Sequence, residues 1–175
     1  MDACSFAKAA LATAHRLQTA VVPLLRQLPS EVTPPPDQPV LPHSLFKGTR
    51  GYIEKVIFQI NRTYTGTSYD ACAVMIRRLV EILIIEAFEH CALSAKILDA
   101  NGNYLRLEEL VRLSLAEPSW TLGRNTKAAL MKLKTIGDQS AHSRRYNARK
   151  EYIDDVIVDL RVSAEEFLYL SGLKK

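Results

Sequence analysis

The chain reads SYDACAVMIRRLVEILIIEAFEHCAL at residues 68–93, the most apolar stretch of its 175 residues. Apolar side chains cover nearly every face of a helix built from this stretch, which is typical of a helix buried on all sides. Glu81 and Glu86 interrupt the apolar run, so we do not expect a membrane span. The stretch predicts the central core helix of an all-α protein.

Shorter amphipathic segments follow and precede this core helix. Apolar residues at helical spacing predict further helices over residues 51–64, 107–116, 125–142 and 148–170, the last with Gly172 as a C-cap. A turn sequence at residues 99–103 could join its flanks in one very short β-hairpin. No internal repeat is visible, so we expect an antiparallel helical bundle with short loops.

The N-terminal part of the chain has a different composition. Residues 1–28 are rich in Ala and Leu at helical spacing and predict an amphipathic helix. Residues 29–49 include six prolines and predict a linker in extended geometry, although a proline-rich segment can also be an adaptor ligand. The bundle itself is expected over residues 50–175.

The cysteines and the N-terminal residues indicate in which cellular compartment the protein acts and whether it binds a metal. Three widely spaced cysteines without a CxxC pair or a histidine cluster indicate neither a disulfide framework nor a zinc site. The N-terminus lacks the basic and apolar regions of a signal peptide. We therefore expect a cytoplasmic protein with no membrane association, no metal and no cofactor.

Positive charge is concentrated in one part of the chain. Eight basic residues lie between positions 124 and 150, against a single acidic residue, Asp138, while the net charge of the whole chain is +4. Such a field attracts polyanions such as RNA. A solvated helix face that keeps the protein soluble explains the same run equally well.

Two pairs of polar residues stand out on the predicted helices. Asp138 and His142 are four residues apart, so they share a helical face and the carboxylate could orient the imidazole. Arg77 and Glu81 have the same spacing on the core helix and can form an ion pair. In so apolar a helix, that pair is either a structural network or part of a site.

Three motifs resemble the HEPN superfamily, in particular an uncharacterised prokaryotic branch. The matching motifs are Arg77-Arg78-Leu79-Val80-Glu81, Leu107-Glu108-Glu109-Leu110 and Ile136-Gly137-Asp138-Gln139-Ser140-Ala141-His142. In that branch an Ile-Gly-Asn-x-x-x-His ending precedes the final helix, and here Asp138 replaces the Asn. The resemblance covers about residues 50–174.

The resemblance implies a dimeric helical bundle of the kind found in antiviral defence, toxin and restriction-associated proteins. Many HEPN members are metal-independent ribonucleases with an Arg shortly before the His. This chain has His142, but Thr135, Ile136 and Gly137 stand where that Arg is expected, and the nearest upstream cation is Lys134. The superfamily also includes inactive and purely binding branches.

Two hypotheses follow for the function. In the first, the protein binds RNA and could cleave it: Asp138 orients His142 as the proton acceptor, Arg77 or the arginines after His142 stabilise phosphate charge, and Glu81 completes the site. The expected phosphate-binding residues are Lys134, Arg144 and Arg145.

In the second hypothesis, the protein is a non-catalytic dimerisation or docking module of a larger assembly, acting through its N-terminal helix and spacer. His142 would then serve only to cap or pack a helix end. A homodimer and a companion protein are the expected partners beside RNA. An open cleft shared by His142 and Arg77 would favour the first hypothesis, and burial of both would favour the second.

Overall fold

The computed structural model describes residues 13 and 40–175. Within this part, the α-helices are α2 (His43–Phe46), α3 (Gly51–Thr65), α4 (Tyr69–His90), α5 (Leu107–Ala116), α6 (Arg124–His142) and α7 (Lys150–Leu170), with a 3-10 turn η1 (Ser94–Lys96). Apart from residue 13, the predicted helix at 1–28 lies outside the described residues, as does the first part of the predicted linker. Each helix predicted between residues 51 and 170 is confirmed, with ends shifted by at most a few residues.

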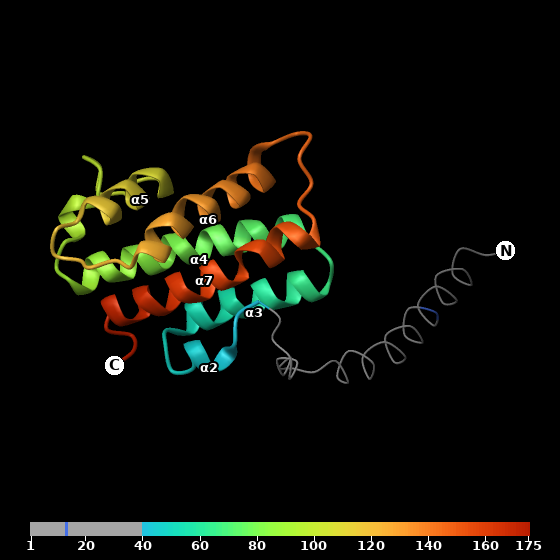
Figure 1. Ribbon diagram of the computed structural model, residues 1–175, viewed down its shortest axis with the longest axis horizontal. Coiled ribbons are helices and arrows are strands. Elements are labelled where there is room, and N and C mark those ends of the chain that lie inside the picture. The colour runs from blue at the N-terminus through green and yellow to red at the C-terminus, as the bar shows by residue number, and fades with distance from the viewer. Residues whose placement is uncertain (1–12, 14–39) are drawn as a thin grey trace, which may run out of the picture. The chain divides into compact units, whose positions relative to one another are not determined.

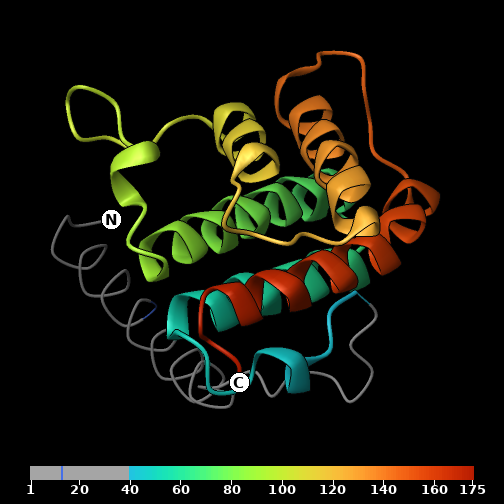
Figure 2. The same ribbon diagram turned by 60° about the vertical axis from the view of Figure 1, so that its left-hand side comes forward.

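Helix α4 is the centre of the bundle, as its apolar sequence predicts. It packs against α3, α5, α6 and α7 (Figure 1). Figure 2 shows α5 and α6 on one side of α4, with α3 and α7 on the other. The side chains of Ile76, Leu79 and Leu83 are almost fully buried among these helices. The all-α helical bundle is therefore confirmed in the described part of the chain.

The turn after α4 contains the nearest approach to a β-hairpin. Leu98 and Tyr104 form one isolated antiparallel bridge, and the carboxylate of Asp99 accepts hydrogen bonds from the backbone N–H groups of Asn101 (2.8 Å) and Asn103 (2.9 Å). Gly102 adopts a φ of 80°, which favours glycine. The predicted very short hairpin is thus a single bridge closed by an Asx-type turn.

The packed bundle begins before residue 50. Val40, Leu41 and Phe46 are fully buried, although they fall within the predicted linker 29–49. The side chain of Asn61 accepts hydrogen bonds from the N–H groups of Val40 (3.1 Å) and Leu41 (3.0 Å) and donates to the Leu41 carbonyl (2.8 Å). The prolines prevent a long helix here, but an extended segment can still pack its apolar side chains.

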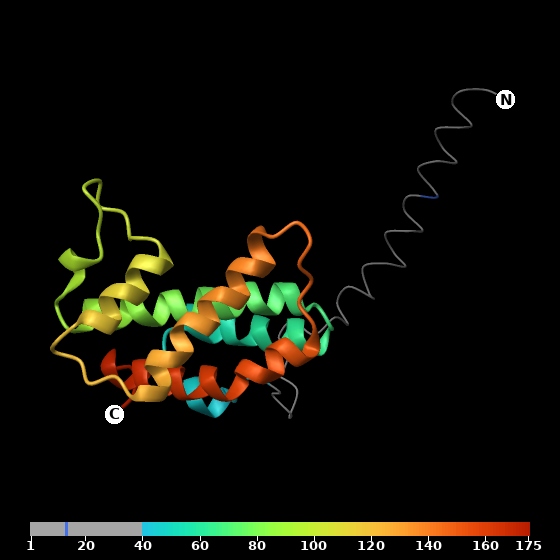
Figure 3. The same ribbon diagram turned by 45° about the horizontal axis from the view of Figure 1, so that its top comes forward.

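The connection between α6 and α7, residues 143–149, lies at one end of the bundle. Figures 1 and 3 place it near the turn between α3 and α4, at the end opposite η1. The N–H of Ala148 donates to the carboxylate of Asp70 in the first turn of α4 (2.9 Å), which fixes the connection to the bundle. No helix in the described residues combines the length and apolarity that crossing a membrane requires.

Candidate functional site

Gly137 lets α6 cross α4 at very short range. A Cβ atom built on Gly137 would lie 2.4 Å from Cβ of Arg77 and 3.0 Å from the carbonyl oxygen of Ala73. No side chain fits at that distance, so glycine is required at the crossing. The close approach places Arg77 of α4 beside the residue that follows Gly137 on α6.

That residue, Asp138, joins the two helices through ion pairs. Its carboxylate oxygens lie 2.6 Å from Nε of Arg77 and 2.7 Å from Nζ of Lys134. Arg77 also reaches Glu81, with a nitrogen to oxygen distance of 3.7 Å, as the four-residue spacing predicts. We call Arg77, Glu81, Lys134 and Asp138 the ion cluster; their side chains are between 16% and 31% exposed.

The charges of the ion cluster determine the protonation of Asp138. Partial burial alone would raise the pKa of Asp138, but the hydrogen bonds from Lys134 and Arg77 outweigh it. The pKa of Asp138 therefore lies below its ordinary value of 3.8. Asp138 is a carboxylate at neutral pH, and both of its oxygens are occupied by cations.

His142 is the last residue of α6 and is exposed. Among the described residues its ring makes no hydrogen bond and no ion pair. The expected orientation of His142 by Asp138 differs from the structure, because Asp138 pairs with Arg77 and Lys134 instead. Both of these partners are fully charged donors, and hydrogen bonds from charged donors to a carboxylate are short and strong.

Of the eight basic residues between positions 124 and 150, three form ion pairs and five form none within residues 40–175; two of these five, Arg124 and Lys127, lie in the first turn of α6. Lys132, Lys134 and Lys150 form ion pairs with acidic residues of α6 and α7. Lys134 was expected to hold phosphate, but it is engaged by Asp138. Arg144, Arg145 and Arg149 are exposed, and none of the three forms an ion pair within residues 40–175. We call His142, Arg144, Arg145 and Arg149 the basic surface.

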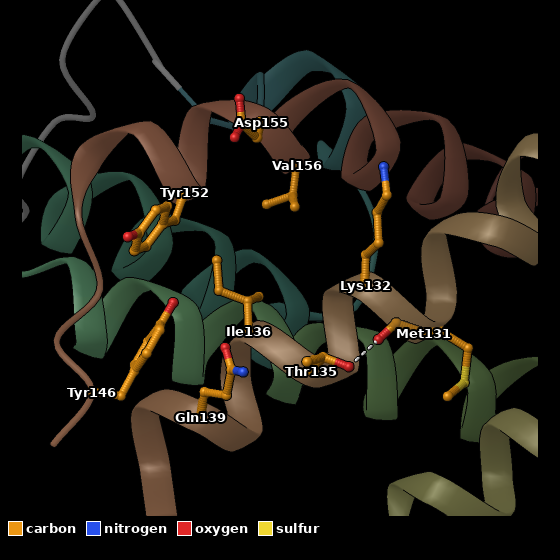
Figure 4. Close-up of a pocket in the computed structure, with 9 residues that line it drawn as sticks. All are labelled: Met131, Lys132, Thr135, Ile136, Gln139, Tyr146, Tyr152, Asp155 and Val156. Atoms are coloured by element: carbon orange, nitrogen blue, oxygen red, sulfur yellow. Dashed lines mark hydrogen bonds between the residues drawn. The ribbon is translucent and has the colours of Figure 1, made fainter. Parts of the chain in front are cut away.

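A groove of about 740 Å³ opens between α6 and α7, next to the connection that carries the basic surface (Figure 4). Buried Ile136 and Val156 line it, together with Met131, which is 51% exposed. Tyr146 and Tyr152 also line the groove, and their rings stack with centroids 6.1 Å apart and an interplanar angle of 22°. We call this feature the tyrosine groove.

Sequence reasoning did not single out the tyrosine groove. A signal was present, because Tyr146 directly follows Arg144 and Arg145, and Tyr152 lies two residues after Lys150, with Glu151 between them. Burial, together with the nearby Tyr152 and Asp70, raises the pKa of Tyr146. The phenol of Tyr146 therefore stays protonated and neutral at physiological pH.

Within the described residues, no three His, Cys, Asp or Glu side chains gather in an arrangement that could hold a metal ion. Comparison of the chain with protein-family models, with curated proteins and with solved structures returns no match. The geometry of the site and the motif resemblance therefore carry the functional interpretation.

Proposed function

We propose that this protein binds RNA through the basic surface at the end of α6. The observation that carries the proposal is that Arg144, Arg145 and Arg149 all lie in the short connection that follows His142. All three side chains are exposed, and none has an acidic partner among the described residues. Unpaired cations on a fixed support attract phosphates strongly, because no internal ion pair has to be broken on binding. Asp70 and the backbone of Ala148 supply that support.

The motif resemblance gives RNA preference over other polyanions in this proposal. By this resemblance, His142 corresponds to the histidine of the HEPN ribonuclease motif, while the Arg of that motif is absent from positions 135–137. An imidazole without a partner among the described residues is free to act as a proton acceptor, and adjacent arginines can stabilise charge on a phosphate. We therefore extend the proposal to metal-independent cleavage: His142 accepts the 2′-hydroxyl proton, the 2′-oxygen forms a bond to the adjacent phosphorus, and the P–O5′ bond breaks, with the leaving 5′-oxygen taking its proton from water or from the protonated His142.

In this proposal the ion cluster positions the site and does not touch the RNA. Arg77 and Asp138 fix α6 on α4, and the two helices then hold His142 and the connection at one end of the bundle. Arg77, Glu81 and Asp138, expected as catalytic residues, thus have a positioning role. Phosphate binding falls to Arg144 and Arg145, as expected, and to Arg149.

Binding is tested with the double variant Arg144→Ala/Arg145→Ala and a fluorescent RNA. We expect the affinity of the variant to be about ten-fold or more weaker, since each arginine that binds a phosphate contributes through counterion release. The control Arg106→Ala/Arg112→Ala removes the same charge near α5 and should bind as the wild type does. Equal affinity for the test variant and the control would contradict the proposal.

Cleavage is tested with His142→Ala. Wild-type protein incubated with structured RNA in excess chelator should produce fragments, and the variant should produce none while retaining most of the binding. Fragments at the same rate from both proteins would show that a contaminant is responsible. Binding without fragments from the wild type would leave the RNA-binding proposal and remove the catalytic one.

One observation favours the second candidate function, a dimerisation or docking module. On the outer face of α7, Val158 is 69% exposed, Val162 41% and Tyr169 52%. Exposed apolar side chains along one helix are typical of protein contacts. If this face forms a dimer, Val158→Asp should halve the mass of the protein in solution by sedimentation, and an unchanged mass would contradict it.

A further inference from the structure

The tyrosine groove has the features of a site for a nucleic-acid base. We infer that it receives one unpaired base of single-stranded RNA, stacked on the tyrosine pair, while the neighbouring phosphates lie on the basic surface. This inference rests on the proposed function and adds the class of RNA to it. It requires a π-face, an apolar floor and cations arranged on one side.

The tyrosine pair supplies the π-face. Tyr152 is 40% exposed, and its ring is nearly parallel to that of Tyr146. A base inserted between the two rings would need a separation of about 3.5 Å on each of its faces. The ring centroids are only 6.1 Å apart, which is too close for a base between them. We therefore place the base on an outer face of the pair, beside the groove that both tyrosines line.

The remaining walls suit a flat, partly polar ring. Ile136 and Val156 form an apolar surface in the groove, and the side chain of Met131 can adapt to a ligand (Figure 4). The hydroxyl of Thr135 is occupied by the Met131 carbonyl at 2.7 Å. Gln139 projects from α6, makes no side-chain hydrogen bond with a described residue, and offers both a donor and an acceptor to a base edge.

The charges around the groove determine on which side of it the phosphates of a bound RNA strand would lie. Asp155 lines it from α7, and Lys132 is neutralised by Asp159 at 3.0 Å. Phosphate is therefore repelled on the α7 side and attracted on the side of the connection, where Arg144 and Arg145 directly precede Tyr146. A duplex cannot use this arrangement, because its bases are already paired and stacked. Single-stranded RNA is the class that fits.

The test compares two RNA probes on the full-length protein by fluorescence anisotropy. One probe is a short oligouridylate, which stays unpaired, and the other is an RNA duplex with the same number of phosphates. Tyr152→Leu should bind the oligouridylate about 5- to 100-fold more weakly than the wild type, because one base loses its stacking partner. Its affinity for the duplex should not change.

Two further variants separate stacking from general damage. Tyr152→Phe keeps the ring and should restore the affinity for the oligouridylate. Tyr104→Leu removes an exposed tyrosine outside the groove, in the turn after α4, and should behave as the wild type does. A 2-aminopurine base in the oligonucleotide should be quenched on binding to the wild type and not to Tyr152→Leu, which tests stacking without relying on affinity.

Failure of this inference is distinct from failure of the proposed function. If the Arg144→Ala/Arg145→Ala variant loses affinity while Tyr152→Leu binds both probes normally and quenches 2-aminopurine, the basic surface binds RNA without a base in the groove. If the wild type binds neither probe, both ideas fall. If Tyr152→Leu instead changes the mass of the protein in solution, the groove is a protein interface and the inference is overturned.

Discussion

At the scale of single residues, Gly137 determines how closely two helices approach. We predict that Gly137→Ala lowers the free energy of unfolding by about 1–3 kcal/mol, because the new methyl group would overlap Arg77 and the Ala73 carbonyl. Urea denaturation measures the change. In an ordinary helix position the same substitution would stabilise the protein.

Gly51 provides the matched control for this prediction. It lies in the first turn of α3, and a Cβ atom built there meets nothing within 4 Å. Gly51→Ala should therefore be neutral or slightly stabilising. If Gly137→Ala were as stable as Gly51→Ala, the close crossing of α4 and α6 would not exist in solution.

Asp138 gives a prediction with a defined pH dependence. Its pKa is below 3.8 in the folded protein, so its ion pairs stabilise the fold above the pKa of the unfolded state and are lost as the pH falls through the folded pKa. Asp138→Asn should cost about 1–2 kcal/mol at pH 7. The difference from the wild type should shrink below pH 3.8.

Denaturation curves over a series of pH values measure this difference, with Asp155→Asn as the control. Asp155 is exposed and forms no ion pair with a described residue, so its substitution should change stability little at any pH. A gap between the wild type and Asp138→Asn that stays constant down to strongly acidic pH would show that the ion pairs are not its cause.

At the scale of elements, Asn61 attaches the segment before α2 to the side of α3. We predict that Asn61→Leu lowers the free energy of unfolding by about 1–3 kcal/mol, because two N–H groups and a carbonyl lose their partner. Amide hydrogen exchange at Val40 and Leu41 should accelerate more than exchange in α4. Gln59→Leu, which replaces an exposed amide on the same helix, should leave both quantities unchanged.

The elements also show how far the sequence could predict the fold. Periodicity located the long helices because each buries a continuous apolar stripe, and the all-apolar pattern of α4 marked it as central. It could not show that Glu86, which interrupts that pattern, is buried and partnered by Arg50 at 2.8 Å and by the Tyr52 hydroxyl. It also missed α2, since four residues contain too little periodicity.

The candidate site was predictable only where its contacts are local. The Arg77 to Glu81 pair follows from helical spacing, and the structure confirms it. The Asp138 pair with Arg77 joins residues 61 positions apart and depends on the crossing at Gly137, so helical spacing alone could not favour it over His142. The tyrosine groove likewise exists only once α6 and α7 lie side by side.

At the scale of the whole molecule, the uneven distribution of charge predicts a salt effect. We expect the affinity for RNA to fall as salt rises, and the slope of log K against log salt to decrease by about 0.7 for each phosphate that a variant no longer binds. Arg144→Ala/Arg145→Ala should show this reduced slope. The Arg106→Ala/Arg112→Ala control should keep the slope of the wild type, and an identical slope for all three proteins would contradict the proposed surface.

The C-terminus and the basic surface lie at opposite ends of the bundle (Figure 1). The C-terminus lies at the end of α7 far from the connection that carries Arg144 and Arg145 (Figure 1). A dye or a sensor-chip tether attached after Lys175 would thus leave the cationic end unobstructed. A sample immobilised through this end is therefore the one on which the proposed RNA binding should be measured.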